Sequence, residues 1–383
     1  MQKEKVFIII PTYNEASVIA DTVAQVFAVT DNIIDFEVHV LIFDSASTDN
    51  TQAIIAELQT HHRQLHFQKE REKSGLGSAY LQAMRYAMNV LKADIVFEFD
   101  ADLSHQPKYL APMLEKIKTC DVVVGSRYVK GGSIPQAWGF HRKLFSILGN
   151  YVARTILTPR YKDFTSGFRA TRCQILKKVL PKTFLSNHFA YKLHLLWLLH
   201  KSGVKIAEQP IEFIDREKGQ SKLPANSIID SLFVVFTLRY FELKRYLKMC
   251  LVGVVGMGVQ FIVYNLLRDS LPPFNATQFA VLASILNNFI LNTRFTFKSQ
   301  LTNRPHKLKR LTGFIAYSIV IIYLQSYWLK LGIYYLGEGM LRENSILALG
   351  IALLSLLNYF TYSRHIWPES KKMLAGAKVQ KAV

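Results

Sequence analysis

The sequence predicts an α/β domain followed by an all-α transmembrane domain of four helices. Three observations support this fold class: short apolar runs alternate with helical segments up to about residue 225, four long uncharged stretches follow, and 50% of the residues are hydrophobic. Lys and Arg number 47 against 28 Asp and Glu, a balance typical of a membrane protein with a basic cytoplasmic side. Because no basic stretch is interleaved with groove-reading motifs, we expect no nucleic acid partner.

Four apolar runs are the expected strands of the α/β domain, at residues 6–10, 38–43, 94–99 and 121–126. Residues 15–29 and 51–58, which separate them, have the pattern of helices. Strands that alternate with helices form a largely parallel sheet, and ligands bind beyond the carboxyl ends of such strands. Polar residues follow all four runs, at 12–15, 44–49, 100–102, and at Ser126 with Arg127. The sequence therefore predicts a binding site at this edge of the sheet.

Asp100 and Asp102 lie one residue apart at the end of the third apolar run. Side chains at i and i+2 of an extended chain point the same way, so both carboxylates can approach one cation. Carboxylate oxygens suit a hard ion such as Mg²⁺ or Mn²⁺. An acidic turn before Pro107 is the alternative, because Asp is common in turns. The polar groups at the other strand ends favour the metal site.

The four uncharged stretches are residues 249–267, 271–293, 311–329 and 344–363. Each is long enough, at 1.5 Å per residue, to cross a bilayer core of about 30 Å. The connection 294–310 and the segment after the fourth stretch are basic, so both are expected on the cytoplasmic side. The run 6–10 is too short for a signal peptide. We therefore expect an integral protein of a prokaryotic plasma membrane, with the α/β domain and both termini in the cytoplasm.

These patterns divide the chain into four parts: the α/β domain at 1–225, an interfacial amphipathic helix at 226–246, the transmembrane domain at 247–368, and a basic cytoplasmic tail at 369–383. The segment 228–246 is apolar, rich in aromatic residues and basic at its end, as expected of a helix in the membrane interface. The alternative is a soluble helix packed on the α/β domain. The three scattered cysteines suggest neither a disulfide framework nor a zinc site.

Seven segments of the first domain, taken in order, resemble glycosyltransferase family 2, and within it the dolichol-phosphate mannose synthases. They are PTYNE (11–15), DSASTDNT (44–51), GLGSAY (75–80), DADLSH (100–105), GSRYVKGG (125–132), DFTSGFRA (163–170) and FIDREKGQSK (213–222). The resemblance implies a GT-A (Rossmann-like) fold and inverting transfer of a hexose from a nucleotide sugar to a polyprenyl or dolichyl phosphate. Mannose from GDP-mannose is the first choice, and a UDP-glucose or UDP-aminosugar donor is the alternative.

The resemblance also implies the residues that contact the donor. Asp100 and Asp102 would hold the Mg²⁺ or Mn²⁺ ion that neutralises the leaving diphosphate. Ser104 stands where many relatives carry Gln, which leaves its part in metal binding open. The other donor-binding residues implied are Pro11, Tyr13, Glu15, Asp44, Arg216 and Lys222. Ser45 replaces the second member of an acidic pair that begins at Asp44, so guanine and uracil both remain possible bases.

The same resemblance assigns Arg127, Arg142 and Ser146 to the phosphate of the acceptor lipid, and Asp163 to a position near it. Arginine suits this task because its planar fork binds phosphate oxygens bidentately. Asp163 would orient the partners of the phosphate or act as a base, and Arg127, Asp163, Asp100 and Asp102 form the expected catalytic set. Salt bridges, a solvated helix face or a turn are the structural alternatives. His194 aligns with a family Glu but lies on an apolar helix, so we leave it out of this set.

The segment NNFILNTRFTF (287–297) resembles part of a small four-helix family associated with glucosylated O-antigen export. Its residues Asn287, Asn288 and Asn292 are costly in hydrocarbon unless they face other helices or a polar cavity. A path for lipid headgroups is one interpretation, and hydrogen bonding between helices is the one we favour. A rival function for the whole chain is a lipid-linked-sugar translocator with a degenerate catalytic domain. The sequence does not predict an oligomeric state.

Overall fold

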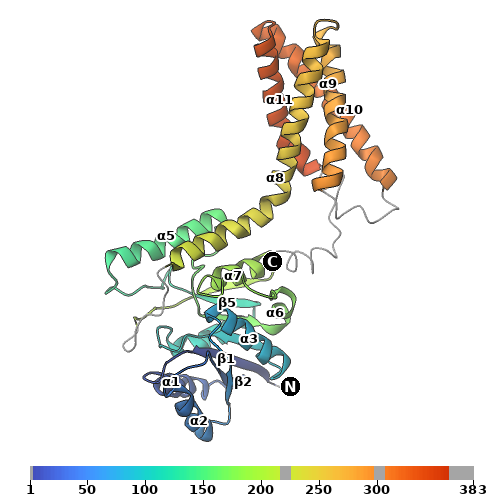
Figure 1. Cartoon of the computed structure of the whole chain (residues 1–383). Helices are drawn as coiled ribbons and strands as arrows, with labels where there is room; N and C mark the ends of the chain where they lie inside the picture. Colours follow the sequence, from blue (N-terminus) through green and yellow to red (C-terminus); the bar gives the residue numbers. More distant parts are fainter. Residues whose placement is uncertain (1–2, 216–225, 297–306, 362–383) are drawn as a thin grey trace. The chain divides into compact units, whose positions relative to one another are not determined.

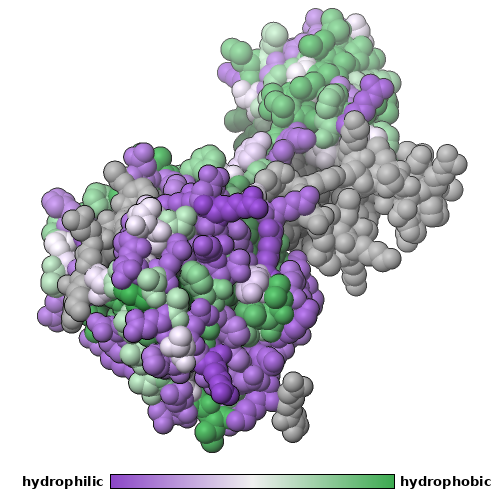
Figure 2. All heavy atoms as spheres, turned by 60° about the horizontal axis from the view of Figure 1, so that its bottom comes forward, coloured by the Kyte–Doolittle hydropathy of each residue, from purple (hydrophilic) through white to green (hydrophobic). Residues whose placement is uncertain are grey.

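The computed structural model describes residues 3–215, 226–296 and 307–361 (Figure 1). The chain forms two compact units: an N-terminal unit that extends to Arg239, and a helical unit that begins at Tyr240. Figure 2 shows that hydrophobic side chains gather on the helical unit, whereas the face of the N-terminal unit seen there is mostly hydrophilic. This division agrees with the change in composition along the sequence.

The described part of the N-terminal unit contains one seven-stranded sheet with the order β3-β2-β1-β4-β6-β5-β7. Its strands are β1 (Glu4–Thr12), β2 (Phe36–Asp44), β3 (Leu65–Lys69), β4 (Ile95–Glu98), β5 (Val122–Ser126), β6 (Arg169–Arg172) and β7 (Ile206–Pro210). All pairs are parallel except those of β6, which runs antiparallel to both β4 and β5. The four predicted strands correspond to β1, β2, β4 and β5, and the α/β class is confirmed.

Helices cover both faces of the sheet (Figure 1). The helices before residue 215 are α1 (Ile19–Thr30), α2 (Thr51–His61), α3 (Leu76–Asn89), η1 (Pro107–Tyr109), α4 (Leu110–Ile117), α5 (Phe140–Ile156), α6 (Cys173–Val179) and α7 (Tyr191–Lys201), and α5 lies away from the sheet. Along β1, Phe7 and Ile9 belong to the core formed with α3, α6 and α7, whereas Ile8 and Ile10 belong to the core formed with α1, α2 and α4. Successive side chains of a strand point to opposite faces, so a strand buried on both faces has to be apolar throughout.

Helix α8 (Ser227–Leu267) is 41 residues long, and its first part contains the predicted interfacial segment. One face of this part packs on the N-terminal unit, because Val234 and Val235 belong to its buried core and the Ser186 hydroxyl donates a hydrogen bond to Asp230. On the same stretch, Ile229 and Phe233 leave 67% and 59% of their surface exposed. The segment is therefore anchored to the α/β domain and still presents large apolar side chains outward.

The helical unit continues with α9 (Pro273–Leu291), the π-helical turn η2 (Asn292–Thr296), α10 (Lys307–Leu336) and α11 (Met340–Thr361). Among the described residues, three segments are long and apolar enough to cross a membrane: Tyr246–Leu267, Pro273–Thr296 and Gly313–Leu336. They overlap the first three predicted spans. Helix α11 has 22 residues, and Ile346 and Leu347 on it are buried against the other helices, but it does not meet the same standard. The fourth span therefore stays a prediction.

Candidate active site

Strands β1 and β2 end side by side, and their polar residues form the first part of the site. Thr12 pairs with Asp44 in the sheet, and its hydroxyl donates a 2.9 Å hydrogen bond to the Asp44 carboxylate. The same carboxylate accepts bonds from the backbone N–H and hydroxyl of Ser47 and from the Gln52 amide. Because it is fully buried and accepts several bonds within its own loop, Asp44 fixes the shape of residues 44–52.

The loop after β1 is joined to the loop after β2 by reciprocal hydrogen bonds. The Asn14 backbone N–H donates to the Ser47 hydroxyl at 2.9 Å, and the Thr48 N–H donates to the Asn14 side-chain oxygen at 2.8 Å. Asn14 has a φ of 51°, a left-handed conformation that Asn tolerates better than most residues. Next to it, the Nζ atom of Lys73 lies 3.5 Å from the centre of the Tyr13 ring. The fold thus places the predicted donor-binding residues of the two loops together. Lys73, which was not among the predicted residues, lies beside them.

Asp100 and Asp102 follow β4 at the same edge of the sheet. The side chain of Asp100 is 23% exposed, and Asp102 is partly exposed as well. One oxygen of Asp102 accepts a 3.1 Å hydrogen bond from the Ser104 backbone N–H, which fixes the turn between them. Residue Leu103 in this turn has a φ of 56°. The two carboxylates are therefore held within one tight turn at the mouth of the sheet.

The Asp100 and Asp102 carboxylates fit a hard divalent cation, which prefers oxygen ligands. Within the described residues, no group of three or more His, Cys, Asp and Glu side chains is arranged to hold a metal ion. Besides the two carboxylates, an ion at this turn would take oxygen ligands from outside the protein, as Mg²⁺ commonly does.

His105, three residues after Asp102, is buried beside the same turn. Its Nδ1 atom lies 3.4 Å from Asp100 Oδ2. Burial lowers the pKa of His105 to about 4, although the Asp100 charge acts in the opposite direction. The imidazole is therefore neutral near pH 7. It packs against Phe168 and Phe213 as an aromatic ring in the wall of the site.

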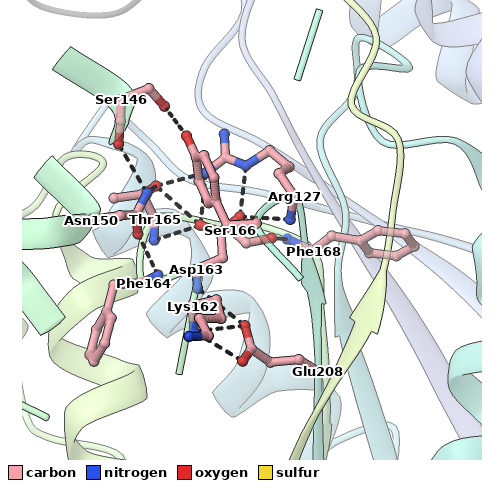
Figure 3. Close-up of polar contacts among 11 residues, drawn as sticks. Arg127, Ser146, Asn150, Lys162, Asp163, Phe164, Thr165, Ser166, Phe168 and Glu208 are labelled. Atoms are coloured by element: carbon pink, nitrogen blue, oxygen red, sulfur yellow. Dashed lines mark hydrogen bonds and ion pairs between the residues drawn. The ribbon is translucent and has the colours of Figure 1, made fainter. Parts of the chain in front are cut away.

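Arg127 and Asp163 form a buried ion pair beyond β5 (Figure 3). The Arg127 Nε and Nη2 atoms donate to the two Asp163 oxygens at 2.7 and 2.8 Å, and Nη2 also donates to the Thr165 hydroxyl at 2.7 Å. Burial by itself raises the pKa of Asp163, but the charge and hydrogen bonds of Arg127 outweigh it and hold the pKa below its ordinary value. Asp163 is therefore a stable anion that orients Arg127.

Residues of α5 complete this network (Figure 3). The Asn150 side chain accepts a 2.7 Å bond from the Phe164 N–H and donates to the Thr165 hydroxyl at 3.1 Å. The Ser146 hydroxyl is hydrogen-bonded to the Tyr128 hydroxyl at 2.7 Å, and the Ser146 carbonyl accepts a bond from Asn150. Ser146 is thus joined to the Arg127–Asp163 pair through Asn150 and Thr165.

Arg142 lies at the exposed edge of this region. Its guanidinium group is 4.1 Å from the centre of the Trp138 ring and bonds both oxygens of Asp215, at 3.0 and 3.2 Å. Trp138 in turn contacts Phe213, whose ring lies 5.4 Å from the Arg127 guanidinium group. The two arginines therefore stand on either side of an aromatic pair. The other predicted donor residues, Arg216 and Lys222, lie outside the described residues.

A second buried ion pair supports the site from beneath. Arg169 on β6 donates to both oxygens of Glu98 on β4, at 2.6 and 2.9 Å, and both side chains are 1% exposed. The Tyr191 hydroxyl donates to the same Glu98 carboxylate at 2.8 Å. Sequence reasoning missed this group, although a lone Glu in an apolar strand signals that it needs a buried partner.

His194 is a core residue of α7, as the apolar pattern of that helix predicts. It is 2% exposed, its Nδ1 accepts a 3.2 Å hydrogen bond from the Leu185 backbone N–H, and its ring packs edge-on against Phe184. Burial lowers the pKa of His194 to about 4. The neutral imidazole, with its proton on Nε2, satisfies this environment.

The depressed pKa of His194 predicts that acid weakens the fold. The unfolded chain binds a proton below about pH 6.5, whereas the folded chain resists it until about pH 4. The stabilisation is therefore complete above pH 6.5 and falls as the pH drops, by roughly 3 kcal/mol by pH 4. We expect His194→Asn, which keeps an acceptor and cannot titrate, to flatten the fall in Tm between pH 7 and 5. An unchanged slope, with His61→Asn as the exposed control, would contradict this prediction.

Polar side chains also meet inside the helical unit. Gln260 donates a 2.9 Å hydrogen bond to Gln325, and Asn265 donates to Asn344 at 3.2 Å. The Asn288 side chain packs against Gly256 of α8, so closely that a side chain at position 256 would overlap it. These contacts agree with hydrogen bonding and close packing between helices. Gln260, Asn288 and Gln325 also line a cavity within this unit, together with Asn292.

Comparison with known proteins identifies the family of the chain. A model of glycosyl transferase family 2 matches residues 7–180, and a model of the GtrA/DPMS transmembrane domain matches residues 248–367. The dolichol-phosphate mannosyltransferase of Pyrococcus furiosus is 32% identical over 347 residues, which cover 87% of this chain and 93% of that protein. The polyprenol monophosphomannose synthase of Mycolicibacterium smegmatis is 32% identical over 61% of this chain and 86% of that protein.

A solved structure shows a more distant likeness. Glucosyl-3-phosphoglycerate synthase from Mycobacterium tuberculosis, in complex with Mn²⁺, UDP and glucosyl-3-phosphoglycerate, is 17% identical with a TM-score of 0.44, and the match covers 62% of this chain and 80% of that one. This likeness is too weak to identify a substrate. The matches to the two sequence relatives cover 93% and 86% of those proteins. The chain belongs to glycosyl transferase family 2 and carries a GtrA/DPMS transmembrane domain, as its motifs predict.

Proposed function

We propose that the protein transfers mannose from GDP-mannose to the phosphate of a polyprenyl or dolichyl phosphate at the cytoplasmic face of the membrane. The observation that carries this proposal is the position of Asp100 and Asp102 in a partly exposed turn beyond β4, beside the Tyr13 and Asp44 loops. In this proposal a nucleotide diphosphate binds between these groups. The names of the two sequence relatives support a mannosyl donor and a polyprenyl phosphate acceptor.

In the proposed reaction, Asp100 and Asp102 hold a divalent ion, Mg²⁺ or Mn²⁺, which when bound neutralises charge on the departing nucleoside diphosphate. Tyr13 and Asp44 position the nucleoside. The acceptor phosphate is already anionic at neutral pH, so it needs orientation and charge compensation rather than a strong base. Attack on the face of the sugar opposite the leaving group inverts the anomeric configuration.

Arg127 and Arg142 have different parts in this proposal because their surroundings differ. Arg127 is closed on Asp163 and Thr165, so it orders the acceptor side of the site and offers the phosphate only its remaining N–H groups. Arg142 is 52% exposed, and its bond to Asp215 can be exchanged for a phosphate at little cost. We therefore infer that Arg142 makes the first contact with the lipid phosphate.

The exposed apolar residues of the N-terminal unit support an acceptor that is a lipid. On α5, Phe140 and Tyr151 leave 73% and 62% of their surface exposed, and Leu144, Ile147 and Leu148 on the same helix are also exposed. The first part of α8 presents a similar apolar face. Surfaces of this kind on a charged, soluble-type domain are typical of contact with a membrane.

Sugar transfer by the purified full-length protein tests the proposal. GDP-mannose, UDP-glucose and UDP-N-acetylglucosamine, each radiolabelled, are offered separately with polyprenyl phosphate and Mn²⁺. We expect label from GDP-mannose in the lipid fraction. That label should be lost when EDTA is added, and also when polyprenyl phosphate is left out. If label came from a UDP sugar instead, GDP-mannose would be the wrong donor and that UDP sugar would take its place in the proposal. Label that appears without a lipid phosphate would refute the acceptor.

Replacing Arg142 by Ala is expected to raise the KM for polyprenyl phosphate roughly tenfold or more, because one charge-assisted hydrogen bond is worth about 1.5–3 kcal/mol. The value of kcat should change little, since the residue lies at the edge of the site. Steady-state kinetics with varied lipid phosphate provide the measurement. Arg63→Ala, at an exposed position after α2, is the matched control. An equal fall in kcat with an unchanged KM would contradict a role in binding the acceptor.

A further inference from the structure

Lys192 is a buried lysine whose ammonium group reaches the predicted metal ligands. It lies in the first turn of α7, where its neighbours Tyr191 and Leu193 are core residues. Its side chain is 8% exposed, and its Nζ atom lies 3.7 Å from Asp100 Oδ2. Lysine is rarely buried without a partner of opposite charge. The position therefore needs an explanation beyond the packing of α7.

The fold leaves a space that this side chain fills. A Cβ atom at Gly167 would lie 2.7 Å from Lys192 Cε and 3.4 Å from Asp100 Oδ2, so a side chain there would displace the end of the lysine. The backbone of Lys192 is fixed as well, because its carbonyl accepts a 3.4 Å bond from Arg169, the partner of Glu98. Both the absence of a side chain at Gly167 and the buried ion pair thus direct the ammonium group toward Asp100.

The two carboxylate oxygens of Asp100 have different neighbours. Its Oδ2 atom faces both Lys192 Nζ, at 3.7 Å, and Nδ1 of the His105 ring, at 3.4 Å. The Tyr80 hydroxyl lies 3.5 Å from the other oxygen, Oδ1. A lysine carries a full positive charge and cannot serve as a metal ligand while protonated. A divalent ion on Asp100 therefore has to share this carboxylate with a resident ammonium group, which repels it.

We propose that Lys192 is a donor-binding residue: its ammonium group occupies Asp100 before the donor enters and binds the donor diphosphate afterwards. The diphosphate in this proposal rests on the proposed function, whereas the competition with a metal ion rests on the geometry alone. Two consequences follow. The nucleotide-free protein binds a divalent ion weakly, and a nucleoside diphosphate binds measurably without metal because a fixed positive charge awaits it. Metal and nucleotide then strengthen each other's binding, since the nucleotide draws the lysine away from Asp100.

Binding measurements on the full-length protein in detergent test this proposal. The variants are Lys192→Met, which removes the charge at similar length, and Gly167→Ala, which displaces the charge without removing it. Lys201→Met, at the other end of α7, is the matched control. Free Mn²⁺ is measured by electron paramagnetic resonance, and binding of GDP and UDP by calorimetry with and without Mn²⁺. A thermal melt of each variant shows whether it is folded.

We expect Lys192→Met to bind Mn²⁺ alone roughly tenfold more tightly than the wild type and to bind GDP or UDP without metal at least tenfold more weakly. Gly167→Ala should shift both affinities in the same directions, and Lys201→Met neither. Unchanged Mn²⁺ affinity in both site variants, or in Gly167→Ala alone if Lys192→Met does not fold, would overturn the proposal. Wild-type protein that binds neither GDP nor UDP would refute the proposed function, and the Mn²⁺ comparison would still decide the competition.

Discussion

Replacing Asp102 by Asn is expected to lower sugar transfer by roughly 10³-fold, because loss of metal-assisted charge neutralisation removes several kcal/mol of transition-state stabilisation. The change is nearly isosteric, and the turn can keep its hydrogen bond from the Ser104 N–H to the side-chain oxygen. The fold should therefore survive, with a Tm within a few degrees of the wild type. Initial rates of label transfer to polyprenyl phosphate, at saturating donor and Mn²⁺, provide the measurement.

Two comparisons make the Asp102 result decisive. Asp35→Asn alters an exposed carboxylate that pairs with Lys118 on the surface, and it should leave the rate unchanged. Raising Mn²⁺ should restore little activity to Asp102→Asn, since an amide oxygen is a much weaker ligand than a carboxylate. If Asp102→Asn retained transfer close to the wild-type rate, metal-dependent chemistry at this turn would be wrong. If it kept lipid-linked sugar translocation in vesicles while the wild type showed no transfer, the translocator would become the better function.

Local sequence patterns predicted the parts of the fold that local interactions determine. The apolar runs that became β1, β2, β4 and β5 are recognisable because each is buried on both faces, and the polar residues that follow β1, β2 and β4 lie at one edge of the sheet. Strands β6 and β7 have the sequences RATR and IAEQP, which carry too few apolar residues for any local signal. They are strands because neighbouring strands pair with them, and this pairing depends on residues distant in sequence.

Charged partners were harder to predict than strands. Sequence reasoning placed Arg127 on an acceptor phosphate and Asp163 near it, but it did not predict that the two close on each other across 36 positions. Lys192 and Glu98 carried a usable signal, since each is a charge inside an apolar segment and each needs a buried partner. The identity of the partner is a property of the tertiary fold. A single sequence therefore predicts that a buried charge has a partner, but it does not predict which residue that partner is.

The buried Glu98–Arg169 pair should be among the largest contributors to the stability of the N-terminal unit. Replacing Arg169 by Met leaves the Glu98 carboxylate and the Tyr191 hydroxyl in the core without the guanidinium group that links β4 to β6. Breaking a buried pair from one side typically costs 3–5 kcal/mol, which lowers Tm by roughly 10 °C in a domain of about this size. Thermal unfolding of the full-length protein in detergent, followed by a thiol-reactive or intrinsic fluorescence signal, provides the measurement.

The double variant Glu98→Leu with Arg169→Met separates the cost of an unpaired charge from the value of the pair itself. It removes both charges, so it should recover much of the Tm that Arg169→Met loses, because an apolar pair of similar volume is often as stable as a buried ion pair. Lys108→Met, which breaks an exposed pair with Glu212, should change stability by less than about 1 kcal/mol. A double variant as unstable as Arg169→Met would mean that the fold needs the specific hydrogen bonds of this pair. Because Arg169 also holds the backbone of Lys192, the double variant should bind nucleotide more weakly even where its Tm recovers.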